Sequence, residues 1–506
     1  MTRTFFLVSS IFIFILTISC NRPADSSQPW RVTELAAQVW VKATPSRTPL
    51  VIPTRAANQP IPTPTPDPTR ILPTPRTQPD EYIVKPNDTL GLIAQRFNVD
   101  INALIQENKL KNPNQLQVGQ VLKIPVPELQ ARGPSFKIIP DSELVNGPAL
   151  ADFDINQFLS KSKGYLSTYQ EEVDGTSLTG AEIIERVSQD FSVGARILLA
   201  VLEYQSGWVT QPSPPANRME YPMGVIDPRR KGLYLQLTWA ASYLNFGYYY
   251  WRVNAVSSWT FSDGSVVPVA NGINAGTAGV QKLFSLLYPR SSWERAVTDQ
   301  GVFATYTKLF GYPHDYAVDP LLPRGLRQPP LQLPFEPGAV WSYTGGPHAG
   351  WGLGSAWAAI DFAPPGNALG CVQSNSWVVA MANGLITRAD RGAVIQDLDS
   401  DGIEQTGWTI LYMHIESRDR VAPGTYLKAG ERIGHPSCEG GVSTGTHVHI
   451  ARRYNGEWIS ADGSIPLNME GWIASSTGSE YNGILVRDGQ TIEAWNGRKP
   501  ENQIQR

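Results

Sequence analysis

The sequence predicts a multidomain protein, with a small α+β module near the N-terminus, a mainly α middle domain and a mainly β antiparallel C-terminal domain. A chain of 506 residues is long enough for about three domains. Two proline-rich stretches, at residues 44–80 and 319–337, mark boundaries. Between them, apolar residues recur at helical spacing. After the second stretch, apolar runs alternate with glycine and aspartate turns, which indicates strands and hairpins.

The N-terminus has the layout of a secretory signal. Arg3 precedes an apolar run from Phe5 to Ile18, and a small residue stands before Cys20. Residues 1–20 resemble a bacterial lipoprotein signal, which implies lipidation of Cys20 and a cell-membrane lipoprotein that faces the wall. Thr17 stands where that family usually has leucine, so an uncleaved membrane anchor is the alternative. In both cases the rest of the chain is expected to be exported.

The charge composition argues against one class of binding partner. Charged residues make up 17% of the chain, the net charge is −3, and the sequence contains no basic run, so nucleic acid is not an expected partner. Residues 21–80 are expected to be a linker. Its Thr/Pro-rich part cannot build a core and should be extended, at about 3.1 Å per residue, as a stalk above the membrane.

Residues 81–127 combine two strand-like ends, YIV and VLKIP, with two short helical patterns between them. The order of DTL, IAQRF, ALIQEN and LQVGQVLKIP resembles a LysM module, a βααβ unit that binds N-acetylglucosamine-containing glycans. The alternative is a module that has lost its glycan affinity. The resemblance implies a groove between two loops, with the candidate residues Asn87, Asp88, Thr89, Leu110, Asn112 and Leu116.

Residues 135–318 form the expected helical middle domain, followed by the linker at 319–337. The stretches 198–208, 232–244 and 273–280 resemble the lysozyme-like lytic transglycosylase fold. That family places its catalytic acid where this chain has Gln205, and an amide cannot protonate a glycosidic oxygen. We therefore expect a non-catalytic glycan holder. The alternatives are an unrelated helical spacer and a domain whose activity is restored by Glu203 or by a carboxylate elsewhere.

The C-terminal domain, expected at residues 338–475 with an extension at 476–506, holds five of the 6 histidines. In GTHVHIARR, His447 and His449 lie two residues apart. On a β-strand such side chains point to the same face. This suits a metal ligand beside a proton-handling base; the alternative is a pair of histidines that hydrogen-bond at a strand end.

Three segments around these histidines, TGGPHAGWGLGSAWAAIDFAPP, LYMHI and THVHI, resemble lysostaphin/LytM-type zinc metallopeptidases, which cut peptide bonds in peptidoglycan. The resemblance implies Zn²⁺ held by His348, Asp361 and His449, and catalytic roles for His414 and His447. Two imidazoles and one carboxylate leave a fourth position open for water, as a catalytic zinc site requires.

One departure from that family concerns the first histidine. The family commonly has three residues between this histidine and the aspartate, whereas here residues 349–360 number twelve. They are rich in Gly, Trp and Ala and are expected to form a loop that leaves the strand-borne Asp361 in place. His435 is the alternative ligand to His348.

Two further motifs lie in this domain. If Cys20 carries lipid, Cys371 and Cys438 remain as an even pair in an exported protein, which predicts a disulfide; two buried thiols are the alternative. DLDSDGIEQ, at residues 397–405, begins like a calcium loop, but its twelfth position is Trp408 rather than glutamate. A glycine-closed hairpin turn is therefore expected, with calcium binding as the alternative.

Taken together, these features predict a cell-surface zinc endopeptidase that trims peptidoglycan, with the upstream domains holding it on the wall. The rival hypothesis is a catalytically inactive regulator or wall-binding protein of the same fold. A third hypothesis, a bifunctional enzyme with a glycan-cleaving middle domain, is disfavoured by Gln205.

Overall fold

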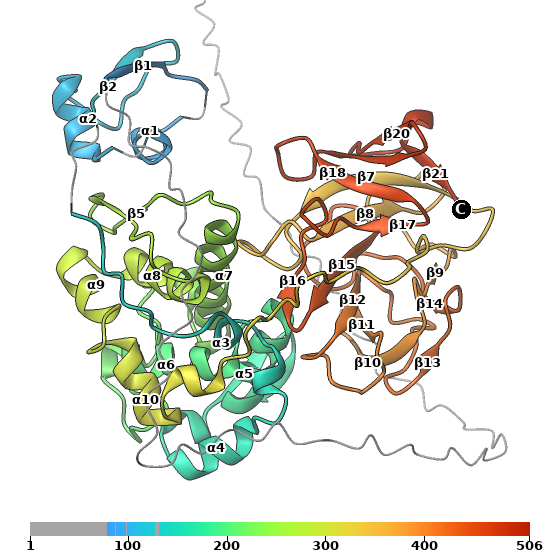
Figure 1. Cartoon of the computed structure of the whole chain (residues 1–506), viewed down its shortest axis with the longest axis horizontal. Helices are drawn as coiled ribbons and strands as arrows, with labels where there is room; N and C mark the ends of the chain where they lie inside the picture. The colour runs from blue at the N-terminus through green and yellow to red at the C-terminus, as the bar shows by residue number, and fades with distance from the viewer. Residues whose placement is uncertain (1–77, 87, 98, 127–130) are drawn as a thin grey trace, which may run out of the picture.

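The computed structural model describes residues 78–86, 88–97, 99–126 and 131–506 (Figure 1). The predicted signal, Cys20 and nearly all of the linker before residue 81 lie outside these residues. Among the helices described, none is both long and apolar enough to cross a membrane.

The N-terminal module has the predicted βααβ order. Asp100 caps the second helix by accepting hydrogen bonds from the backbone amides of Asn102 and Ala103. Leu104 and Leu122 are fully buried and form the centre of a small separate core. The elements are β1 (Asp80–Ile83), α1 (Leu90–Phe97), α2 (Ile101–Glu107) and β2 (Val121–Ile124), with β1 and β2 antiparallel.

The middle domain is mainly helical, as the periodicity predicts. Its central helix α6 (Ala195–Ser206) is buried on nearly every side, because residues 197–202 are all apolar. A capping box between Thr179 and Glu182 begins α5. The other elements are α3 (Asp141–Leu144), α4 (Ile155–Ser162), β3 (Gln170–Val173), β4 (Thr176–Thr179), α5 (Gly180–Phe191), α7 (Leu233–Arg252), β5 (Ser258–Thr260), β6 (Val266–Pro268), α8 (Ala275–Leu287), α9 (Arg290–Ala296) and α10 (Val302–Phe310).

The C-terminal domain is built on one large antiparallel sheet in the order β13-β10-β11-β12-β15-β8-β7-β21, with β16 paired to β15. A smaller sheet has the order β17-β18-β19-β20, and β9 pairs with β14. The strands are β7 (Val340–His348), β8 (Ala359–Ala363), β9 (Val378–Val379), β10 (Gly384–Asp390), β11 (Ala393–Asp397), β12 (Trp408–Met413), β13 (Tyr426–Leu427), β14 (Arg432–Gly434), β15 (Val448–Tyr454), β16 (Glu457–Trp458), β17 (Asn468–Met469), β18 (Trp472–Ser476), β19 (Gly483–Arg487), β20 (Gln490–Glu493) and β21 (Gln503–Gln505).

Both expected borders of this domain differ from the structure. Residues 476–506, expected as an extension, supply β19, β20 and β21, and β21 pairs with β7 of the large sheet. Within the stretch expected as a linker, Leu331, Leu333 and Phe335 are buried in the C-terminal core. Proline content marked the boundary, but the apolar residues between the prolines attach this segment to the sheet.

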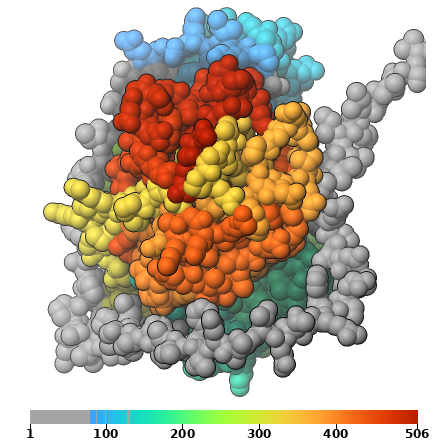
Figure 2. All heavy atoms as spheres, turned by 90° about the vertical axis from the view of Figure 1, so that its right-hand side faces the viewer, coloured from blue at the N-terminus to red at the C-terminus, as the bar shows by residue number. Residues whose placement is uncertain are grey.

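The large sheet is buried on both faces. Along β12, Ile410 and Tyr412 join the core of the C-terminal domain, whereas Leu411 and Met413 join a core shared with the middle domain. This follows from the alternation of side chains along a strand. In Figure 2 the C-terminal domain, yellow to red, lies over the middle domain, which shows green below it. The two domains therefore pack as one body around a common apolar layer.

Ion pairs whose carboxylates are buried cross the same interface. Asp190 of α5 accepts a hydrogen bond of 2.7 Å from Arg388 of β10. Arg252 of α7 pairs with Glu457 of β16 at 3.1 Å. Desolvated charges of this kind destabilise a structure unless each has its partner, so they fix how the two domains fit together.

Candidate metal centre

The metal-ligand candidates converge on one face of the large sheet. Asp361 of β8 lies directly opposite His449 of β15 in the antiparallel register. His348 is the last residue of β7, the strand on the other side of β8. By strand alternation, Asp361 shares its face with Ala359, and His449 shares its face with Ala451. Both alanines belong to the core shared with the middle domain, so the site opens on the face that the middle domain partly covers.

Distances within the group suit a small cation. Nε2 of His348 lies 3.4 Å from Oδ1 of Asp361 and 3.0 Å from Nδ1 of His449, and the latter two atoms are 3.2 Å apart. Tetrahedral zinc with bonds near 2.0–2.1 Å requires ligand separations of about 3.3 Å. Oδ1 of Asp361 is buried and has no hydrogen-bond partner among the described residues. A cation at this point would satisfy it, so the residues fit Zn²⁺.

The second nitrogen of each histidine ligand is held by the backbone. Nδ1 of His348 donates to the Gly346 carbonyl at 2.8 Å, and Nε2 of His449 donates to the Gly350 carbonyl at 3.1 Å. A carbonyl oxygen only accepts, so these contacts fix the tautomers and leave Nε2 of His348 and Nδ1 of His449 free for a metal. Gly350 belongs to the long loop between β7 and β8, so this loop takes part in the site.

His414 and His447 stand beside the ligands. Their ring centroids are 4.4 Å apart, and Nε2 of His447 lies 3.7 Å from Oδ1 of Asp361. Nδ1 of His414 donates to the Glu439 carbonyl and Nδ1 of His447 donates to the Gly445 carbonyl, which leaves both Nε2 atoms as acceptors. His447 lies directly before β15 and forms an isolated antiparallel β-bridge with Ser437. His447 and His449 both face Oδ1 of Asp361, so these two histidines contribute to one site.

Burial and neighbouring charges shift the pKa values of these groups in different directions. Burial opposes ionisation of Asp361, but His348 and His447 outweigh it and hold the pKa of this carboxyl well below its usual range. Burial also opposes protonation of His348, yet Asp361 raises the pKa of His348 above its ordinary value. Burial, with His447 and His449 nearby, lowers the pKa of His414 to about 3. Burial likewise lowers the pKa of His449.

Sequence reasoning missed two residues of the loop between β18 and β19. The ring of Tyr481 stacks on His348 with centroids 4.2 Å apart, and Oε1 of Glu480 accepts a hydrogen bond from the Ala349 amide. Tyr481 has a positive φ of 66° and keeps about half of its side chain exposed. These residues carry no motif, and only the sheet pairing of residues expected as an extension brings them to the site.

The alternative ligand His435 lies elsewhere. Its ring packs on Trp377 at 3.9 Å, and its Nε2 faces Asp419 at 3.4 Å. It is not part of the cluster formed by the other candidates.

Cys371 and Cys438 form a disulfide in the structure. Cys438 precedes Glu439, whose carbonyl holds His414. On the other side of the bridge, the Gly370 carbonyl accepts a hydrogen bond from the Thr446 amide, beside His447. The disulfide thus joins the segment that holds His414 to the segment that contacts the chain beside His447.

The glycan-groove candidates of the N-terminal module are partly structural. Thr89 accepts a hydrogen bond from the Leu92 amide, and Asp88 accepts one from the hydroxyl of Tyr82. Leu110 and Leu116 are half-buried against the core of the module. Asn112 is exposed, and Asn87 lies outside the described residues.

In the middle domain, Gln205 is buried and accepts a hydrogen bond from the hydroxyl of Tyr288. The Glu203 carboxylate accepts hydrogen bonds from the amides of Val209 and Thr210 and from the Thr210 hydroxyl. Glu203 therefore stabilises the turn that follows α6.

Two family profiles match the chain: the LysM domain at residues 82–125, and the LasA N-terminal domain at residues 137–322. Protease LasA of Pseudomonas aeruginosa (strain UCBPP-PA14) is 25% identical over 309 residues, which cover 56% of this chain and 68% of that protein. Beta-lytic metalloendopeptidase of Achromobacter lyticus is 29% identical over 197 residues, 37% of this chain and 47% of the relative. The chain thus spans about half the length of that relative.

Among solved structures, the M23 metalloprotease pseudoalterin from the deep sea is similar to this chain, with 24% identity and a TM-score of 0.29. The match covers 35% of this chain and 99% of pseudoalterin. The catalytic domain of lysostaphin from Staphylococcus simulans is 26% identical, with a TM-score of 0.18, over 24% of this chain and 87% of that domain.

The chain thus contains a match to the LysM domain and is similar to metallopeptidases of the LytM (M23) type, the resemblance that its motifs predicted. The middle region matches the LasA N-terminal domain, and its lysozyme-like character stays a prediction.

Proposed function

We propose that the protein is a cell-surface zinc metalloendopeptidase that hydrolyses peptide bonds of peptidoglycan, and that its LysM domain holds it on the glycan strands. The observation that carries the proposal is the convergence of His348, Asp361 and His449 around an unpartnered carboxylate oxygen, with two further histidines beside them. The peptidase relatives and the LysM match support the same substrate.

In this proposal His348, Asp361 and His449 hold zinc, which supplies a Lewis acid and lowers the pKa of a coordinated water. His414 resists protonation because it is buried, so we assign it to orienting the attacking water through its free Nε2. His447 is partly exposed and also presents a free Nε2. We assign it to taking the proton and then donating a hydrogen bond to the oxyanion.

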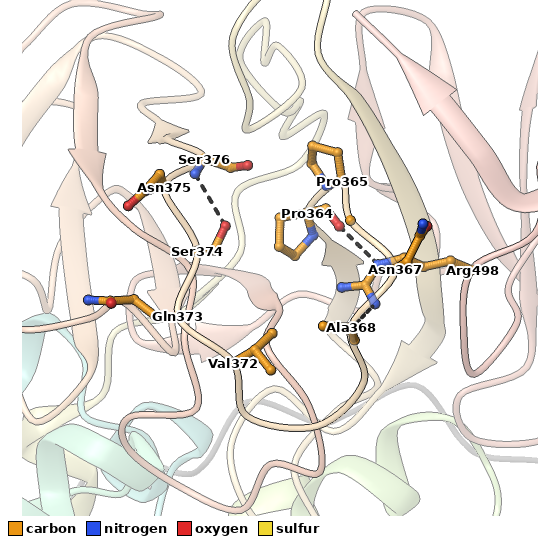
Figure 3. A pocket seen from close by; sticks show the side chains of 11 residues that line it. Pro364, Pro365, Asn367, Ala368, Val372, Gln373, Ser374, Asn375, Ser376 and Arg498 are labelled. Atoms are coloured by element: carbon orange, nitrogen blue, oxygen red, sulfur yellow. Dashed lines mark hydrogen bonds between the residues drawn. The ribbon is translucent and has the colours of Figure 1, made fainter.

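A cavity of about 480 Å³ lies beside the disulfide (Figure 3). It is lined by the turn after β8, residues 364–368, by residues 372–376, and by Arg498, which donates to the carbonyls of Pro364 and Ala368. The Val372 carbonyl on its wall accepts a hydrogen bond from Thr446, next to His447. We propose that this mixed polar and apolar cavity receives part of the peptide substrate.

Export, lipidation of Cys20 and membrane attachment complete the proposal, and they rest on the N-terminal sequence alone. The LysM residues 88, 89, 110, 112 and 116, together with Asn87, are proposed to contact the glycan.

The alternative proposal is a catalytically inactive wall-binding regulator. The observation that favours it is the closure of the site: His348 and Asp361 are only 2% and 7% exposed, and Tyr481 covers His348.

One experiment separates these proposals. Because the middle and C-terminal domains share a core, the purified protein should contain both of them together with the LysM domain. Bound zinc and the release of peptide fragments from purified peptidoglycan would be measured for the wild type, His449→Ala and the control His435→Gln. Equimolar zinc with cleavage in the wild type and the control, both lost in His449→Ala, is expected. Zinc without cleavage would support the regulator, and absence of both would refute the enzyme.

A further inference from the structure

The turn between β11 and β12 gathers three carboxylates. Asp397, Asp399 and Asp401 occupy alternate positions, and one oxygen from each lies within 4.8 Å of the other two. The turn closes at Gly402, whose amide donates to Oδ2 of Asp397 at 2.9 Å. The sequence predicted a hairpin turn here, and the structure forms one.

Among the described residues, the negative charge of this turn has no partner of opposite sign. Within the part of the chain that the structure describes, no lysine or arginine forms an ion pair with any of the three aspartates. Asp397 is fully buried, and its Oδ1 has no hydrogen-bond partner among the described atoms. Burial, together with the neighbouring Asp399, raises the pKa of Asp397 to about 7. A buried carboxylate oxygen without a partner is costly, and a cation would satisfy it.

We propose that residues 397–403 bind Ca²⁺ through the carboxylates of Asp397, Asp399 and Asp401. Calcium prefers hard oxygen ligands and accepts six to eight of them, so backbone carbonyls and water can complete the set. The twelfth position of the loop is Trp408, which cannot supply the usual bidentate carboxylate. We therefore expect weak binding, with a Kd of about 10⁻⁴ to 10⁻³ M, as in extracellular calcium modules.

The proposed calcium-binding turn, residues 397–403, is separate from the candidate zinc site. The turn lies before β12 in the chain, whereas His414 directly follows the last residue of β12. Six residues of strand at about 3.3 Å each separate the two by roughly 20 Å.

The same turn joins the domains. Glu404 pairs with Arg453 at 3.0 Å and with Arg388 at 3.5 Å, and Arg388 pairs with Asp190 of the middle domain. By ordering the turn, calcium should hold Glu404 in this network and stabilise the contact between the two domains.

The test uses the three-domain protein with zinc bound, in calcium-free buffer. Calcium chloride would be titrated by calorimetry, and thermal unfolding would be followed with and without about 5 mM Ca²⁺ or Mg²⁺. The wild type is expected to bind one Ca²⁺ and to unfold at a higher temperature in calcium than in magnesium. Asp399→Ala removes an exposed ligand and should bind at least about tenfold more weakly.

Two controls make the result specific. Glu493→Ala removes an exposed carboxylate from β20, and it should bind calcium like the wild type. His449→Ala should also keep calcium binding, so failure of the peptidase proposal would leave this one testable. Absence of both calcium heat and a thermal shift in the wild type, or equal affinity in Asp399→Ala, would overturn the proposal.

Discussion

Replacing Gly354 by alanine should weaken zinc binding, although Gly354 lies outside the ligand set. Gly354 has a φ of +89°, and an added Cβ would lie 2.4 Å from the Ser242 carbonyl oxygen and 2.8 Å from the Phe246 amide nitrogen. Both are backbone atoms of α7, which cannot easily move. The loop must therefore shift, and the same loop carries the Gly350 carbonyl that holds His449.

The size of the effect can be estimated in two steps. An alanine with left-handed φ costs about 1–2 kcal/mol, and overpacking against fixed atoms costs about 1–3 kcal/mol more. This is enough to detach the loop. His449 would then lose the partner that sets its tautomer, and losses of this kind lower metal affinity by about 10–100-fold, or about 1.4–2.7 kcal/mol.

Zinc affinity would be measured by competition with a chromophoric chelator. Gly424→Ala is the matched control, because Gly424 has a φ of +83° and no described atom within 4 Å of its added Cβ. It carries the same backbone strain without the collision. If both variants bind zinc equally well, the loop does not position His449 and the reasoning is refuted.

Three further outcomes are expected. Asp190→Asn removes one of the two carboxylate partners of the buried Arg388, which keeps Glu404 at 3.5 Å, and should lower the free energy of unfolding in urea by up to about 3 kcal/mol. Glu220 and Lys231 form an ion pair in which both side chains are more than half exposed. Glu220→Gln should therefore cost less than about 1 kcal/mol, and equal losses would contradict the role of the buried network. Burial opposes ionisation of Glu404, but Arg388 and Arg453 lower its pKa below the ordinary 4.5. The ion pairs of Glu404 therefore stabilise the fold fully above its ordinary pKa, and this stabilisation is lost as the pH falls through the pKa of the folded protein. In Glu404→Gln, the free energy of unfolding should decrease less between about pH 5 and 3 than in the wild type. An unchanged pH profile would exclude this role of the Glu404 carboxylate. Glu203→Gln should lower the free energy of unfolding by about 1–3 kcal/mol. Neither the wild type nor this variant should cleave glycan strands. Release of reducing ends by the wild type alone would restore the bifunctional hypothesis.

Local pattern carried the prediction that His447 and His449 face one side, whereas Asp361 and His348 were predicted from the family resemblance. A two-residue spacing on a strand places His447 and His449 toward one side whatever the rest of the fold does. The helical spacing of the LysM module is equally local, and the two short helical patterns predicted between its strand-like ends form α1 and α2. These features depend on a few neighbours in sequence.

The remainder of the site depends on distant contacts. The twelve residues after His348 suggested only a loop, and its course is set by Gly352 and Gly354 against Phe191 and α7, more than 100 positions earlier. Tyr481 reaches His348 because β18 and β19 pair with each other near β7. Neither arrangement leaves a signature in spacing or composition.

The position of the middle domain explains why the site of the C-terminal domain depends on it. Asp361 and His449 point to the sheet face whose apolar residues, Leu411, Met413 and Ala451, are covered by the middle domain. Trp458 is also buried there. It donates its indole N–H to the Phe191 carbonyl and its backbone N–H to the hydroxyl oxygen of Tyr249. A buried aromatic of this size covers about 150–250 Å². Without the middle domain this surface would be open to water, and the loop that orients His449 would lose the helix against which it rests. The middle domain therefore supports the candidate metal centre by covering this face of the sheet and by holding the loop beside His449.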